Sequence, residues 1–142
     1  MHYSLHVIGC RRGVVINVLA AITFLVAGFL SRGFCPASRA ASPWHVIFTH
    51  NLVFAGAITL LTYLSEVAGI VLASSAIGLA MFTCGRAVAC GFTSALLVAI
   101  LEATAYMLAY IVALIETRWR IALAFIMFVV LLVASVVESQ AV

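Results

Sequence analysis

Five long apolar segments, separated by short polar interruptions, make up most of this chain. They are 13–30, 44–64, 67–83, 93–115 and 121–137. About 20 apolar residues in a helix, at about 1.5 Å each, cross the hydrocarbon core of a bilayer. Strict alternation of apolar and polar positions is absent, so helices and not strands are expected. The pattern predicts an all-α, polytopic membrane protein, a compact bundle of five transmembrane helices.

Composition leads to the same class. Of the 142 residues, 67% are hydrophobic and 8% are charged, which leaves too little polar surface to cover a water-soluble globule of this size. The longest interruption, 31–43, is too short for a soluble domain, so we expect one integral membrane domain over 1–142. No basic run is dense enough to indicate nucleic-acid binding.

The amino-terminal segment has some features of a secretory signal, because Arg11 and Arg12 precede an apolar run and then the letters PASRAAS. That apolar run is longer than a usual signal core, and Arg32 follows it directly, so a membrane helix is the preferred interpretation. Orientation is expected from the arginines on the two sides. Four against three favour a cell-membrane protein with a cytoplasmic amino terminus: Arg11, Arg12, Arg118 and Arg120 against Arg32, Arg39 and Arg86.

Glu102 stands near the middle of the fourth segment. An ionised acid there costs roughly 2.5 to 3.5 kcal/mol on insertion scales, so such residues normally face a protein interior or a wet cavity and have a partner. One interpretation is a protonated Glu102 that hydrogen-bonds to a neighbouring helix. The other is a proton or ion relay.

Small and polar residues indicate which helix faces pack, because helices in lipid associate through close contact and hydrogen bonds. In the fourth segment Glu102 and Tyr106 lie on adjacent turns of one small-residue stripe. The full stripe is Ala95, Ala99, Glu102, Ala103, Tyr106, Ala109 and Ala113.

The second segment carries a polar line of the same period, which is expected to face the fourth helix. Its members are Asn51, Ala55, Thr59, Thr62 and Glu66. Thr59 and Thr62 could instead bond back to their own helix, whereas Asn51 needs a neighbour. Two further packing faces are expected, one in the first segment and one in the third: Asn17, Ala21, Phe24 and Gly28, and Gly69, Ala73, Ala76 and Ala80.

No metal, cofactor or catalytic site is expected. The cysteines, Cys10, Cys35, Cys84 and Cys90, lack CxxC spacing. Cys84 and Cys90 could form a disulfide if their loop faces an oxidising space, or could remain free thiols. Ser74 and Ser75 lie in an apolar helix without a GxSxG pattern, so the chain is not expected to be an enzyme.

Part of the chain resembles the stage II sporulation protein M family. The letters IFTHNLVFAGAITLL place an Asn at the start of the second helix, ALLVAILEATAYMLAYIVA resembles the family's carboxylate-bearing helix at Glu102 and Ala105, and ASVVE echoes its last helix at Ala134 and Glu138. The likeness covers 44–138, about two thirds of the chain. Val98 and Ala99 replace the family's His-Gly before the acid.

The resemblance implies a membrane scaffold that recruits partners. We therefore expect a multi-pass protein of structural or scaffolding type, surrounded by lipid, with a membrane-protein partner or a homo-oligomer. The alternative is a small proton- or solute-coupled transporter or channel that uses Glu102.

Overall fold

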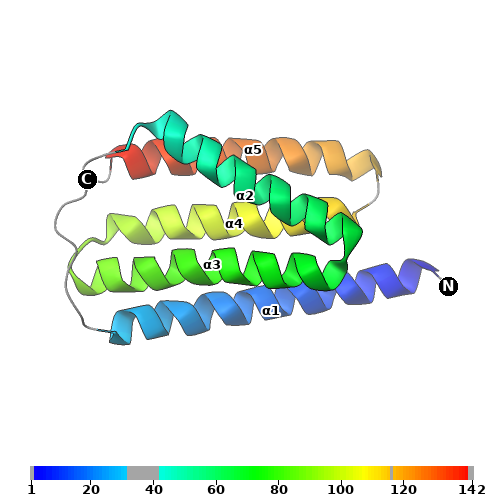
Figure 1. The fold of residues 1–142 in the computed structure, drawn as a ribbon, viewed down its shortest axis with the longest axis horizontal. Helices are drawn as coiled ribbons and strands as arrows, with labels where there is room; N and C mark the ends of the chain where they lie inside the picture. The colour runs from blue at the N-terminus through cyan, green and yellow to red at the C-terminus, as the bar shows by residue number, and fades with distance from the viewer. Residues whose placement is uncertain (1, 32–41, 116, 141–142) are drawn as a thin grey trace.

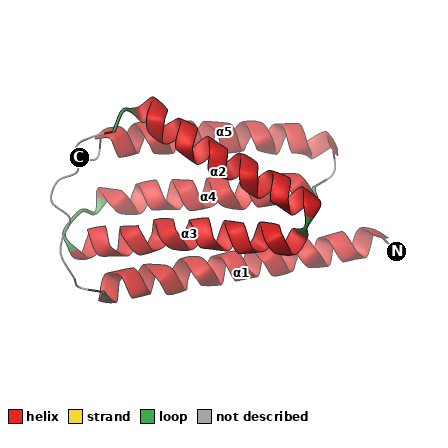
Figure 2. Cartoon of the chain, in the orientation of Figure 1, coloured by secondary structure: helices red, strands yellow, loops and turns green. Residues whose placement is uncertain are grey.

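The structure, a computed structural model, consists of helices joined by short connections (Figure 2). It describes residues 2–31, 42–115 and 117–140, and within them there is no strand. The helices are α1 (His2–Leu30), α2 (Trp44–Leu64), α3 (Glu66–Ala89), α4 (Ser94–Leu114) and α5 (Thr117–Gln140). Each is long and apolar enough to span a membrane. The predicted all-α bundle of five helices is confirmed.

The helix ends differ from the predicted ones where polar residues continue a helix beyond its apolar stretch. α2 has the predicted bounds, and α4 is one residue shorter at each end. α1 begins at His2, before the predicted start at 13, and α3 continues to Ala89, beyond the predicted end at 83. α5 extends past the predicted range at both ends. Hydropathy marks the part of a helix that suits lipid, whereas backbone hydrogen bonds decide where the helix ends.

The ends of α3 are fixed by local hydrogen bonds. Ser65 is its N-cap: the residue is extended, and its hydroxyl accepts from the backbone N–H of Ala68 at 3.4 Å. At the other end Gly91 has a φ of +93°, which favours glycine. The N–H of Phe92 donates to the carbonyl of Ala87, and the N–H of Gly91 donates to that of Val88, both at 2.9 Å. This pair of bonds is a Schellman motif, and it closes the helix.

α4 lies at the centre of the bundle and, among the described helices, contacts all four others. α1 packs mainly on α3, and α2 crosses over α4 and α5 (Figure 1). The fully buried side chains include Ile58, Ile77, Tyr110 and Leu131, one from each of α2 to α5. The two termini lie at opposite ends of the molecule.

Glycines bring α1 and α3 into close contact. Gly28 belongs to the packing face predicted for the first segment, whereas Gly78 and Gly85 of α3 were not predicted. A Cβ added to Gly28 would collide with the backbone carbonyl of Phe82, and one added to Gly85 would collide with that of Leu25. At Gly78 it would meet the ring of Phe24 at 2.8 Å. Small residues at these crossings allow the two backbones to approach, which is how helices associate tightly where lipid removes the hydrophobic drive.

Candidate functional site

Glu102 lies on the face of α4 that points into the bundle. Its side chain is half-buried, and the stripe residues around it, Ala99 and Tyr106, are 3% and 5% exposed. Ile100 lies on the opposite face of α4 and is exposed. Glu102 therefore lies on the inward-facing side of α4, as the helical period predicted.

Asn51 of α2 is the direct partner of Glu102. The Asn51 amide Nδ2 donates to Glu102 Oε1 at 2.5 Å, and Tyr106 Oη donates to Asn51 Oδ1 at 3.1 Å. Asn51 is 4% exposed, so water has almost no access to its amide. The three side chains form one hydrogen-bonded group between α2 and α4, and we call Asn51, Glu102 and Tyr106 the α2–α4 polar cluster.

A second carboxyl group lies near this cluster. Glu138, two residues before the end of α5 at Gln140, is half-buried and close enough to interact electrostatically with both Glu102 and Tyr106. Two carboxyl groups repel each other when both are ionised. Glu138 thus lies near Glu102 of α4, an arrangement that the sequence did not predict.

Thr59 and Thr62 are placed by α2 in different ways. The hydroxyl of Thr62 donates to Ile58 O of its own helix at 2.7 Å, as the alternative interpretation expects. Thr59 bonds back to Ala55 O at 3.0 Å and also reaches Ala109 O of α4 at 3.1 Å. Of these two threonines, only Thr59 therefore links α2 to α4.

The placement of Glu66 on the polar line of the second helix is wrong. α2 ends at Leu64, Ser65 is extended, and Glu66 is the first residue of α3. The extended Ser65 interrupts the helical period of 3.6 residues. Thr62 and Glu66 are four residues apart in sequence, but they therefore do not lie on one helix face. Glu66 instead accepts a hydrogen bond from Tyr110 Oη of α4 at 3.4 Å.

Sequence analysis missed a second polar contact, between α1, α3 and α4. Ser74 donates to Asn17 Oδ1 at 2.7 Å, and the Asn17 amide donates to the sulfur of Met107 at 3.8 Å. Asn17 is fully buried. Its place on the packing face of α1 was predicted, and a serine in the apolar third segment was the signal for its partner.

Arg120 was also assigned incompletely, as a loop charge that sets orientation. It lies in the first turns of α5, where its Nε donates to Val112 O at 3.1 Å and its Nη2 donates to Ile115 O at 3.0 Å. These carbonyls lie at the end of α4, where they lack partners within the helix. The guanidinium therefore caps α4 and joins it to α5.

The cysteine alternatives are resolved in part. Cys84 is a free thiol, 3% exposed, whereas Cys90 is disulfide-bonded. A Cys84–Cys90 disulfide is therefore wrong. Cys35 lies outside the described residues, as do Arg32 and Arg39.

The described residues contain no group of three or more His, Cys, Asp or Glu side chains able to hold a metal ion. Among them, no buried side-chain nitrogen or oxygen lacks a hydrogen-bond partner. The polar groups inside the bundle thus bind one another.

Comparison with known proteins found no matching family model, no matching curated protein and no matching solved structure.

Proposed function

We propose that this chain is a multi-pass membrane protein of structural or scaffolding type, in which a protonated Glu102 bonds α4 to α2 from inside the bundle. The observation that carries the proposal is the hydrogen bond from the Asn51 amide nitrogen to Glu102, together with the hydrogen bond that Tyr106 donates to the Asn51 amide oxygen. Lipid surrounds the bundle, and a membrane protein or a second copy of the chain is its partner.

The chemistry of Asn51 supports a structural role over a relay. Its amide donates through nitrogen and accepts through oxygen, so it joins Tyr106 to Glu102 without a titratable proton of its own. Passing a proton from the phenol to the carboxyl group would require the amide to change tautomer. A neutral amide at this position orients the groups on either side of it and separates them as proton carriers.

The wider contacts of α4 also support a scaffold. Glu102 and Tyr106 bond to α2, Met107 accepts from α1, Tyr110 donates to α3, and α5 caps its last carbonyls through Arg120. Each polar contact fixes a different neighbour, and polar side chains act as specific links between membrane helices. The function we propose is to hold a defined helical surface in the membrane.

The resemblance to the stage II sporulation protein M family implies the same class of protein. We include that family likeness in the proposal at the level of architecture, and we transfer no sporulation role. The proposal also places the amino terminus in the cytoplasm of a cell-membrane protein, and it assigns the chain no catalytic activity.

A small proton- or solute-coupled transporter or channel is the second candidate. One observation favours it: Glu138 lies beside Glu102, and paired carboxyl groups inside a helix bundle are typical of proton and cation pathways. In this case Glu102 would titrate from the end of the bundle at which Glu138 lies.

Reconstituted vesicles distinguish the two functions. The chain and its Glu102→Gln variant are placed in vesicles that contain a pH-sensitive dye, and a pH gradient is imposed. A scaffold predicts that both hold the gradient as long as protein-free vesicles do. Dissipation by the native chain that Glu102→Gln abolishes would contradict the scaffold and establish the transporter. Dissipation that is equal in both would contradict the scaffold, and it would also exclude Glu102 as the group that titrates in a transporter.

A further inference from the structure

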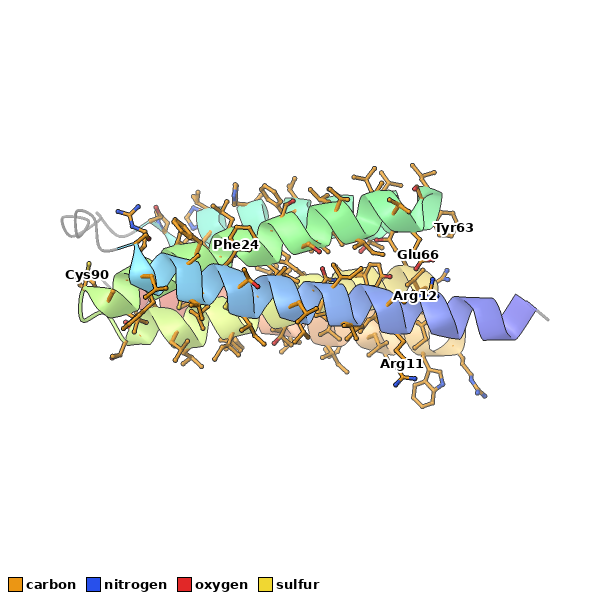
Figure 3. The ribbon with its side chains drawn as sticks, turned by 90° about the horizontal axis from the view of Figure 1, so that it is seen from below. Arg11, Arg12, Phe24, Tyr63, Glu66 and Cys90 are labelled. Atoms are coloured by element: carbon orange, nitrogen blue, oxygen red, sulfur yellow. The ribbon has the colours of Figure 1, made fainter. Side chains whose placement is uncertain are left out.

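Cys90 lies at one end of the bundle, at the turn between α3 and α4. It is the C-cap residue of α3, directly before Gly91 of the Schellman motif. Figure 3 shows Cys90 at the end opposite to Arg11, Arg12 and Glu66. The side chain is half-buried and disulfide-bonded, and its partner is not Cys84, which is a free buried thiol.

Disulfides persist in oxidising compartments and are rare where cellular thiols keep cysteines reduced. We propose that the α3–α4 end of the bundle faces an oxidising compartment outside the cytoplasm, where the disulfide of Cys90 forms as a structural crosslink within the chain. In its formation two thiols lose two protons and two electrons. The protons and electrons pass to the disulfide of a thiol–disulfide oxidoreductase, which becomes a dithiol.

The arginines of the full sequence favour the same orientation by four to three. Arg11 and Arg12 are exposed near the opposite end, and Arg118 and Arg120 begin α5 there. Arg86 lies in the last turn of α3, at the Cys90 end, and the sequence places Arg32 and Arg39 between α1 and α2, whose adjoining ends lie at that same end. Excess arginine marks the cytoplasmic side of a membrane protein. The thiol chemistry and the charge distribution therefore assign the same end to the cytoplasm.

This orientation also assigns a side to the α2–α4 polar cluster. Glu102 is eight residues after Ser94, the first residue of α4, and so lies about 12 Å from the Cys90 end at about 1.5 Å per residue. Glu138 lies in the final turns of α5 at that end. Both acids are thus nearer the outer face, and a solute or partner that reaches them approaches from outside the cytoplasm.

Thiol counting tests the crosslink in the full chain. The protein is expressed in a bacterial membrane, its thiols are trapped with acid, and the denatured chain is reacted with a polymer-tagged maleimide. Because the chain has four cysteines, one disulfide predicts two tags before reduction and four after. Cys84→Ser should give one and then three, whereas Cys90→Ser should give three in both conditions. Four tags on the unreduced native chain would overturn the crosslink. Three tags with a covalent dimer would show a bond between copies and contradict it.

A membrane-impermeant phosphine reductant and an impermeant maleimide test the compartment in intact cells whose inner membrane is sealed. Reduction should expose two further reactive thiols in the native chain and none in Cys90→Ser. Gain of those thiols only after the membrane is permeabilised would place this end in the cytoplasm and overturn the orientation. A host that lacks the periplasmic disulfide donor should yield four tags before reduction, and two tags there would likewise contradict the proposed route of oxidation.

Discussion

Replacing Glu102 by Leu is the most direct perturbation of the α2–α4 polar cluster. The change removes the acceptor of the Asn51 amide, and Asn51 is only 4% exposed, so water cannot take its place. A buried donor without a partner costs about 1 to 3 kcal/mol in soluble proteins, whereas hydrogen bonds between membrane helices are worth about 0.6 kcal/mol on average and about 1.7 at most. We expect Glu102→Leu to lower the free energy of unfolding by about 1 kcal/mol.

Glu102→Gln should be tolerated. Its side-chain carbonyl still accepts from Asn51, and its amide, like a protonated carboxyl group, is neutral. The free energy of unfolding should therefore stay within about 0.5 kcal/mol of the native value. A protonated carboxyl group and a glutamine side chain have nearly the same shape, so the native chain and this variant should fold alike.

The assay is unfolding in mixed micelles by a denaturing detergent, followed by the fluorescence of the two tryptophans, Trp44 and Trp119. Glu102→Leu, Asn51→Leu and the double variant form a cycle whose coupling energy isolates the pair. We expect about 0.6 to 1.7 kcal/mol of coupling. The matched control is Thr104→Leu, since Thr104 is exposed on the same helix and its hydroxyl bonds back to Ile100 O at 2.7 Å.

Two results would contradict a stabilising role for the α2–α4 polar cluster. A coupling energy of zero would show that Asn51 and Glu102 do not stabilise each other. An equal loss in Thr104→Leu and Glu102→Leu would show that any leucine on α4 disturbs the micelle-bound chain, and that the polar cluster contributes nothing specific.

Three further predictions concern other helix contacts, and the same unfolding assay measures each. Gly28→Ala should lower the free energy of unfolding by about 1 to 3 kcal/mol, because the added methyl group forces α1 away from α3. The control Gly56→Ala, with no atom within 4 Å of the added Cβ, should raise it by about 0.5 to 1 kcal/mol. Equal effects of the two substitutions would contradict the close α1–α3 contact. Arg120→Gln should lose about 1 to 2 kcal/mol because the carbonyls at the end of α4 lose a charged donor, and the exposed Arg118→Gln should be neutral. Ser74→Ala should lose about 0.6 kcal/mol by removing the donor to Asn17, and no change would show that this bond adds nothing to α1–α3 packing.

Hydropathy and helical period were enough to predict the class of fold and the inward-facing sides of α2 and α4. Apolar segments of bilayer length leave helices as the spanning elements, because lipid satisfies no backbone polar group. The period of 3.6 then places Glu102 and Tyr106 on one face of α4 and Asn51 on one face of α2. The sequence therefore left Asn51, Thr59 or another interior polar group as the partner of Glu102, and the structure shows that the partner is Asn51.

The three-dimensional arrangement of the helices shows which distant residues contact these groups and where one helical period ends. Glu66 does not continue the polar line of α2, because the extended Ser65 ends α2 and Glu66 begins α3, a separate helix with its own axis. Glu138, Asn17 with Ser74, and the cap by Arg120 depend on how helices from different parts of the chain are oriented about α4. Periodicity fixes the direction of a side chain relative to its own helix axis, and the rotation and depth of neighbouring helices are set by packing among all five.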